Sequence, residues 1–99
     1  IRITNRGTAT HLHRIAREAV SNAVTHGRCK NIRIQLKKKN SHESELRIEN
    51  DGRRFSKNPK KRGLGLRIMR SRAAMLNASF EIAPGSDGGT VVTCVFPLG

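Results

Sequence analysis

The stretch that decides the fold is residues 10–26, THLHRIAREAVSNAVTH. Its apolar side chains recur at steps of three and one, which places them on a single face of a helix. They belong to Leu12, Ile15, Ala16, Ala19, Val20, Ala23 and Val24. Thr10 can cap the start of this helix, and Gly27 supplies the usual stop just past its end. The pattern predicts an amphipathic helix over about residues 10–26.

Two segments of alternating polarity follow this helix. The apolar positions are Ile32, Ile34 and Leu36 in the first segment, and Leu46 and Ile48 in the second. Alternation of this kind is typical of strands with one buried face. The polar residues 37–44 indicate a hairpin connection, so we expect the two strands to pair in antiparallel.

Residues 51–65 are rich in Gly, Arg, Lys, Ser, Asn and Pro. This composition predicts a basic loop without regular structure. Apolar residues then return at nearly helical spacing, which predicts a second helix over about residues 65–77. Gly63 and Gly65 would stand at the head of that helix.

The rest of the chain indicates further strands. Phe80 and Ile82 suggest a third strand, residues 86–89 a turn, and residues 90–96 a fourth strand rich in β-branched side chains. Residues 1–3 are expected to add an edge strand. Two helices and four or five mostly antiparallel strands predict a single α/β (α+β) two-layer sandwich over residues 1–99, with the helices on one face of the sheet.

Charge indicates the chemical class of the partner. The formal net charge of +13 predicts a surface that attracts anions. The chain has no Trp or Tyr and only three Phe, so it lacks the aromatic side chains on which single-strand binders stack bases. A nucleic-acid-binding module is therefore a minor alternative, and no nucleic-acid partner is expected.

The cysteines and the hydropathy pattern indicate the cellular setting. Cys29 and Cys94 lie 65 positions apart, which gives neither a zinc-ligand spacing nor a disulfide framework. No apolar run approaches the ~20 residues that a bilayer requires. A reduced, cytoplasmic domain is expected, with the membrane attachment of a longer parent chain left open.

Three polar residues share one side of the first predicted helix. Glu18, Asn22 and His26 are spaced at i, i+4 and i+8, so each lies ~6 Å from the next. A carboxylate and a carboxamide one turn apart can hold a magnesium ion and its waters. The alternative is an ordinary solvated helix face.

A glycine pair follows a run of cations. The string Gly63-Leu64-Gly65-Leu66 comes after Lys57 and the basic residues 60–62. Glycines before a helix let backbone N–H groups approach a phosphate at the positive end of the helix dipole. The alternatives are a tight turn and a solvated charge run, and the spacing is not that of a P-loop.

The order of these pieces resembles one family. Residues 11–27 closely resemble the N box of sensor histidine kinases, in particular those of the nitrate-sensor type. Residues 63–73 resemble that family's second glycine box with the helix after it, and residues 88–90 its last glycine box. The resemblance spans Leu12 to Pro97, nearly the whole chain.

The resemblance implies a fold, a site and an activity. The fold is the Bergerat-type ATP-binding fold shared with gyrase-type ATPases and heat-shock chaperones. Glu18 would be the catalytic acid of the N box, and Asn22 the ligand to magnesium. The cofactor-binding residues implied for ATP are Asn22, His26, Asn50, Gly52, Gly63, Leu64, Gly65, Leu66 and Thr90.

The chain departs from the family pattern after the second strand. Relatives show Asp-x-Gly-x-Gly, whose Asp accepts a hydrogen bond from the adenine amino group, and this chain has residues 50–54, NDGRR. Parity with Leu46 and Ile48 places Asn50, not Asp51, on the inward face at the family's Asp position. An asparagine can still accept from that amino group, but as a neutral partner Asn50 gives a weaker hydrogen bond than a carboxylate. Arg54 replaces a glycine, and Thr25 stands where relatives often carry a basic residue.

The function implied is phosphoryl transfer from ATP, with magnesium, to a histidine on a separate dimerisation domain of the same homodimeric kinase. A response regulator would be the further partner, reached through the full-length protein. Asn50 and Arg54 leave a second possibility open. This is a regulatory nucleotide-binding module, either degenerate or of the anti-sigma type.

Overall fold

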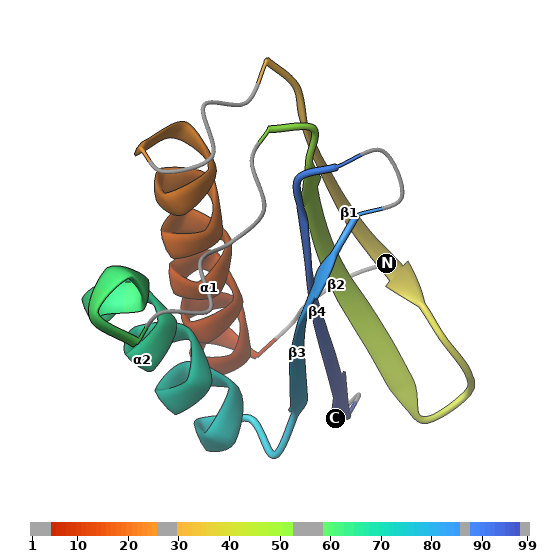
Figure 1. Ribbon diagram of the computed structural model, residues 1–99. Helices are drawn as coiled ribbons and strands as arrows, with labels where there is room; N and C mark the ends of the chain where they lie inside the picture. Colours follow the sequence, from red (N-terminus) through yellow and green to blue (C-terminus); the bar gives the residue numbers. More distant parts are fainter. Residues whose placement is uncertain (1–4, 26–29, 53–58, 86–87, 98–99) are drawn as a thin grey trace.

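The structure is a computed structural model that describes residues 5–25, 30–52, 59–85 and 88–97, with only the backbone described for residues 59–64. The elements are α1 (Arg6–Thr25), β1 (Ile32–Lys38), β2 (Glu43–Asn50), α2 (Pro59–Met75), β3 (Ser79–Pro84) and β4 (Thr90–Pro97). The four strands form one antiparallel sheet in the order β1-β2-β4-β3. Both helices cover the same face of this sheet, so the predicted two-layer sandwich is confirmed (Figure 1). Within the described residues, no helix is long and apolar enough to cross a bilayer.

Helix α1 begins at Arg6, four positions before the predicted start at residue 10. The Asn5 side-chain oxygen accepts a hydrogen bond from the Thr8 backbone N–H at 3.1 Å, which makes Asn5 the N-cap. The predicted cap Thr10 is therefore wrong, because Asn5 supplies an acceptor one turn earlier. The apolar face is confirmed at Leu12, Ile15, Ala19 and Ala23, which are buried. Val24 was also expected on that face but is 61% exposed. The predicted stop, Gly27, lies outside the described residues, and so does the edge strand expected over residues 1–3.

The β1–β2 hairpin is longer than its sequence pattern suggests. Strand β1 ends at Lys38 and β2 begins at Glu43. The connection therefore consists of residues 39–42 and is shorter than the predicted 37–44. The Asn40 side-chain oxygen accepts hydrogen bonds from the backbone N–H groups of His42 and Glu43, both at 2.8 Å. This Asx-type turn lets pairing continue close to the bend.

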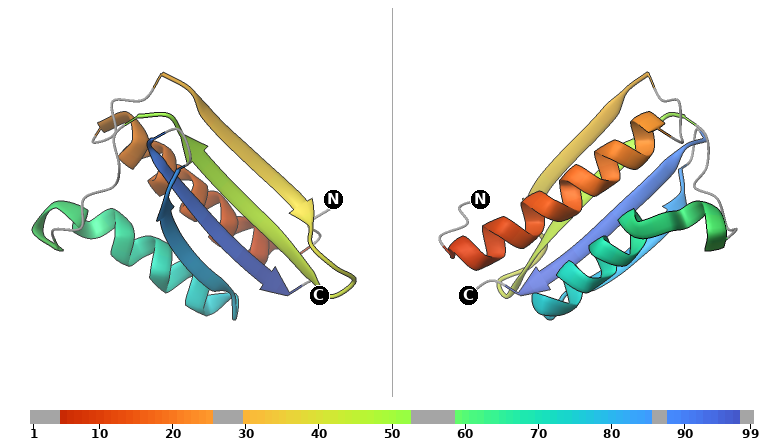
Figure 2. Two further views of the ribbon diagram at one scale, coloured as in Figure 1. Left: turned by 45° about the vertical axis from the view of Figure 1, so that its right-hand side comes forward. Right: turned by 90° about the vertical axis from the view of Figure 1, so that its left-hand side faces the viewer.

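The buried face predicted for β1 is only partly correct. Ile32 packs against the core, but Ile34 is 53% exposed and Leu36 is 36% exposed. Strand β1 lies at one edge of the sheet. Helix α1 lies mainly over β2 and α2 packs on β3, so β1 is at the margin of the helical layer (Figure 2). Alternation in the sequence does not guarantee burial there.

Helix α2 corrects the prediction for residues 51–65. The helix begins at Pro59 rather than residue 65, so Gly63 and Gly65 lie inside it and not at its head. Proline is favoured at the first helical position because its fixed φ suits the helix and its missing N–H is not needed there. The helix ends at Met75, before Asn77, which has a φ of 53°. Asn77 thus provides the left-handed residue that commonly follows a helix.

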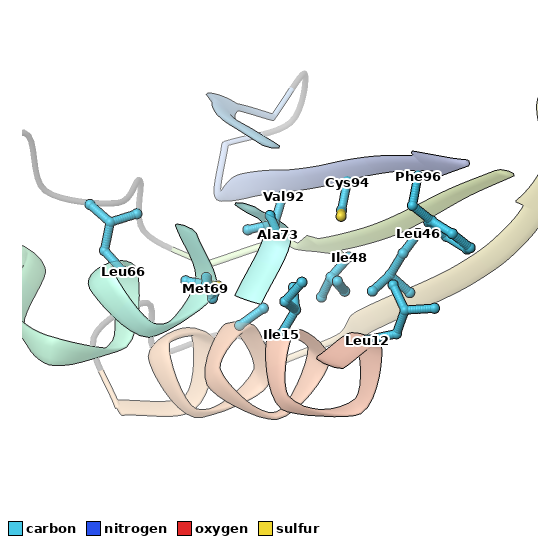
Figure 3. Packing of buried hydrophobic residues seen from close by; sticks show 11 residues of the cluster. Leu12, Ile15, Leu46, Ile48, Leu66, Met69, Ala73, Val92, Cys94 and Phe96 are labelled. Atoms are coloured by element: carbon cyan, nitrogen blue, oxygen red, sulfur yellow. The ribbon is translucent and has the colours of Figure 1, made fainter. Parts of the chain in front are cut away.

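The core fills the space between the helix pair and the sheet (Figure 3). Its buried members are Leu12, Ile15, Ala19, Leu46, Ile48, Leu66, Met69, Ala73, Val92, Cys94 and Phe96. Burial raises the pKa of the Cys94 thiol to about 11. This cysteine therefore stays protonated near neutral pH and acts as a small apolar side chain.

Candidate functional site

The first half of the candidate site is the seam between α1 and α2, where Gly65 faces Glu18 and Asn22. A Cβ atom added at Gly65 would lie 3.1 Å from the Glu18 Oε2 atom and 3.2 Å from both terminal atoms of the Asn22 side chain. Contacts this short leave little room for any side chain at position 65. Glycine therefore lets the backbone of α2 approach these two polar groups closely.

Glu18 is held by a neighbour on its own helix. The Arg14 Nη2 atom lies 3.3 Å from the Glu18 Oε1 atom, one turn away, and the Glu18 side chain is 17% exposed. Since Oε1 is paired with Arg14, Oε2 is the carboxylate oxygen beside Gly65. The sequence interpretation did not include Arg14. The i, i+4 spacing of an arginine and a glutamate was the signal that could have found it.

The seam contains buried donors with unused hydrogen-bonding capacity. Among the described residues, the Asn22 Nδ2 and Arg14 Nε atoms are buried and have no hydrogen-bond partner. A buried donor without an acceptor is costly, so such a group indicates a bound water or ligand. An oxygen acceptor of a bound ligand or water would satisfy the Asn22 donor, and the Asn22 Oδ1 atom is the kind of hard ligand that magnesium prefers.

A second contact joins α1 and α2 farther along the seam. The Arg72 Nη1 atom donates to the His11 Nδ1 atom at 3.2 Å. The guanidinium can only donate, so the His11 Nδ1 atom must be the unprotonated acceptor. The helix that carries Gly65 is thus anchored on α1 at both Gly65 and Arg72.

The second half of the site lies where β2 ends and β4 begins. Asn50 continues the inward row of Leu46 and Ile48, and its register partner on β4 is Thr90, which is 4% exposed. The Asn50 Oδ1 atom accepts a hydrogen bond from the Gly52 backbone N–H at 3.0 Å. The ends of α1 and β2 lie at the same end of the molecule in all views (Figures 1 and 2).

Gly89 packs against Asn50 in a conformation that favours glycine. It has a φ of 71°, and a Cβ atom there would overlap the Asn50 backbone carbonyl. Any other residue would have to move β2 or change its backbone angles. Gly88, with a φ of 85°, precedes it.

The Asp51 side chain accepts hydrogen bonds from residues that precede β1. Its Oδ1 atom accepts from the backbone N–H groups of Lys30 and Asn31 at 2.9 and 3.0 Å, and its Oδ2 atom from the Asn31 Nδ2 atom at 2.8 Å. The hydrogen bonds from Asn31 and Lys30 lower the pKa of the Asp51 carboxyl to about 2. Asp51 therefore joins the start of β1 to the end of β2, which leaves Asn50 as the inward group.

The remaining predicted site residues differ in where they lie. His26 lies outside the described residues, and so does the side chain of Leu64. Leu66 belongs to the hydrophobic core. The structure thus brings Glu18, Asn22 and Gly65 together in one group. It brings Asn50, Gly52 and Thr90 together in another.

A hollow of about 530 Å³ opens at this end of the sheet. It is lined by Asn31, Ile32, Arg33, Glu49, Asn50, Asp51, Gly85 and Gly88. Among the described residues, Asn50 is the only predicted site residue in its lining, and Glu18, Asn22 and Gly65 of the seam do not line it.

Comparisons with known proteins agree with the motif order. The profile of the family described as histidine kinase-, DNA gyrase B-, and HSP90-like ATPase matches residues 7–99. The chain is 34% identical over 94 residues to Sensor protein VraS of Staphylococcus aureus (strain COL) and 33% identical over 94 residues to that of Staphylococcus haemolyticus (strain JCSC1435). Each match covers 94% of this chain but 27% of the relative, so the chain spans about a quarter of the length of these curated relatives.

Solved structures show the same fold. The histidine kinase domain from Erythrobacter litoralis EL346 blue-light activated histidine kinase has a TM-score of 0.73 and 27% identity, over 93% of this chain and 45% of that one. The mycobacterial sensor histidine kinase MprB has a TM-score of 0.69 over 89% of this chain and 72% of that one. At 20% identity, the second likeness concerns the fold alone.

Proposed function

Because the chain belongs to the histidine kinase-, DNA gyrase B-, and HSP90-like ATPase family, we propose that it is the catalytic domain of a sensor histidine kinase. It binds ATP with magnesium and directs the γ-phosphate to a histidine on a separate dimerisation domain. The observation that supports this most is the seam, where Gly65 opens a space beside Glu18 and the unpartnered Asn22 amide. The nitrate-sensor type stays a prediction.

Each seam residue has a chemical role in this proposal. ATP supplies the phosphoryl group, and magnesium neutralises the phosphate charge. The Asn22 Oδ1 atom would be the protein atom that holds the metal. This fits the described residues, which include no group of three or more His, Cys, Asp or Glu that could hold a metal ion.

Glu18 acts on the attacking group. Its carboxylate polarises that group or orders the waters of the metal, and Arg14 holds it in place through Oε1. Asn50 and Thr90 face the base at the strand end, with Gly52 turning the backbone beside them. Most of the catalysis is then positioning and charge neutralisation, as phosphoryl transfer generally demands.

The partners belong to the same proposal, because the chain spans only about a quarter of its curated relatives. They are a histidine-bearing helical domain, a second copy of the full-length kinase and a response regulator. The domain itself would work in the cytoplasm.

Calorimetric titration of the chain with ATP, with and without magnesium, tests the nucleotide site. We expect magnesium-dependent binding that Asn22→Ala abolishes. Ser21→Ala is the matched control, because Ser21 is the adjacent exposed residue on α1 and should leave binding unchanged. Equal ATP affinity of the native chain and Asn22→Ala would contradict the metal role of Asn22.

Phosphoryl transfer is tested by joining the chain to the histidine-bearing helices of its own kinase. We expect labelling of that histidine from γ-labelled ATP, and much slower but measurable labelling in Glu18→Gln with ATP binding retained. ATP binding without any labelling by the native protein would reject the kinase assignment.

That last result would favour the second candidate, a regulatory nucleotide-binding module of the degenerate or anti-sigma type. The observation behind it is Asn50, a neutral amide at the position where the resemblance implies an aspartate. A module of this kind would bind nucleotide and a protein partner without labelling a histidine.

A further inference from the structure

The Asn50 side chain has a defined orientation. Its terminal oxygen accepts from the Gly52 backbone N–H at 3.0 Å. Amide oxygens and nitrogens are usually assigned from their partners, and here the partner is an N–H group that can only donate. The atom facing Gly52 must therefore be the oxygen, so the other terminal atom is the amide nitrogen.

This orientation decides what Asn50 can offer to a ligand. An aspartate in the same pose would use one oxygen for Gly52 and keep a second oxygen as an acceptor. Asn50 carries in that second place an NH₂ group, which has two donors and no acceptor. An isosteric change has thus replaced an acceptor by a donor.

The surroundings hold this pose. Asn50 is part-buried, and Gly89 packs so closely that an added Cβ atom would lie 2.9 Å from the Asn50 Oδ1 atom. Thr90 sits opposite in the register of β2 and β4. A rotation that turned the oxygen toward the ligand would break the hydrogen bond to Gly52, which lies two residues along the same turn.

We propose that Asn50 makes this site select purine nucleotides with a 6-oxo group over those with a 6-amino group. The proposal rests on the proposed function, which places the base beside Asn50, and it refines the substrate class of that site. The 6-amino group of adenine would face the Asn50 NH₂ donor to donor, which leaves both unpaired. The 6-oxo group of hypoxanthine or guanine is an acceptor and completes the hydrogen bond.

Three triphosphates that differ at position 6 test this inference. Calorimetric titrations with magnesium use ITP, ATP and purine riboside triphosphate, which carry an oxygen, an amino group and a hydrogen there. ITP also lacks the 2-amino group of GTP, so it differs from ATP only at position 6 and in the proton that the 6-oxo base carries on N1. Purine riboside triphosphate keeps the unprotonated N1 of ATP and so isolates the loss of the 6-amino group. We expect the native chain to bind ITP more tightly than ATP by on the order of tenfold, the usual effect of leaving a buried polar group unpaired.

Asn50→Asp should reverse the order, with ATP tighter than ITP, because the carboxylate restores an acceptor. Purine riboside triphosphate should lie between the two in both proteins. Glu45→Gln is the matched control, because it makes the opposite carboxylate-to-amide change on the outer face of β2, outside the lining of the hollow at Asn50, and it should keep the native order. Circular dichroism verifies that each variant is folded.

The outcomes separate this inference from the proposed function. Tighter binding of ATP than of ITP by the native chain, or equal binding of all three, overturns the base selection and leaves the nucleotide site standing. The absence of binding by any triphosphate to the native chain overturns both. The native ITP-to-ATP ratio alone decides the matter if Asn50→Asp fails to fold.

Discussion

The two halves of the candidate site are built in different ways. In the seam between α1 and α2, side chains meet across a gap that a glycine keeps open, and buried donors on Asn22 and Arg14 have no partner within the described residues. At the strand end, the Asn50 oxygen is already satisfied by Gly52, and Gly89 packs tightly against it. The seam therefore keeps hydrogen-bonding capacity for a ligand, whereas the strand end fixes the orientation of one recognition group.

This difference has a physical consequence for mutations. Changes in the seam should alter ligand binding and transfer more than folding, because the Asn22 Nδ2 and Arg14 Nε donors form no hydrogen bond within the described residues. Changes at the strand end should alter folding as well, since backbone packing orients Asn50. The predictions below test this contrast, from the largest expected effect to the smallest.

Gly89→Ala should be the most damaging substitution. Alanine at a φ of 71° is strained, and its Cβ atom would overlap the Asn50 carbonyl. We expect a loss of about 3 kcal/mol in the free energy of unfolding, a large share of the ~5–15 kcal/mol typical of a domain. Urea denaturation measures it. Gly7→Ala in the first turn of α1, where φ is not positive, is the control and should shift the free energy by less than about 1 kcal/mol. Similar midpoints for both variants would show that the strand end is not rigidly packed.

Gly65→Val should close the seam while the chain remains folded. The valine side chain would push against Glu18 and Asn22, whose polar atoms would lie only 3.1 and 3.2 Å from the added Cβ atom. We expect nucleotide affinity to fall by more than about tenfold, because a small displacement of the groups that position a ligand is costly. Ala74→Val places the same side chain at an exposed position of the same helix and should leave affinity unchanged. Undiminished affinity in Gly65→Val would place the ligand elsewhere.

Arg14→Met should weaken transfer more than binding. The side chain of Arg14 positions Glu18 across 3.3 Å, and the pair is partly exposed. We therefore expect a decrease of about fivefold in the rate of histidine labelling, with little change in ATP affinity. Since Arg14 acts through Glu18, Arg14→Met should have no further effect in a Glu18→Gln background. Additive losses in this double-mutant cycle would mean that Arg14 acts independently.

The pH dependence of Asp51 should give the smallest effect. Hydrogen bonds lower its pKa in the folded chain to about 2 from an ordinary 3.8, so the folded state favours the carboxylate. The stability that it contributes is complete above its ordinary pKa and is lost as pH falls through about 2. The urea midpoint of the native chain should therefore decline more steeply between about pH 5 and 2 than that of Asp51→Asn. Parallel curves would mean that Asp51 does not connect the two strands.

Local patterns predicted most of the fold. The apolar spacing of Leu12, Ile15 and Ala19 located α1 because a 3.6-residue period has one geometric meaning. Alternation at Leu46 and Ile48 likewise located β2 and set the inward parity of Asn50. The helix boundaries were less accurate, since Asn5 and Pro59 act through capping and backbone angles that composition does not reveal.

The sequence alone determined the order of elements, the motif set and the chemical types available, because these depend on neighbours along the chain. The tertiary structure decided which of these groups meet. Only the packing of α2 on α1 places Gly65 beside Glu18 and Asn22, and only the pairing of β2 with β4 places Gly89 against Asn50. It also left Ile34 exposed on an edge strand that its pattern would have buried. The physical reason is that periodicity fixes the direction of a side chain within its own element, whereas contact and burial depend on the elements that pack against it.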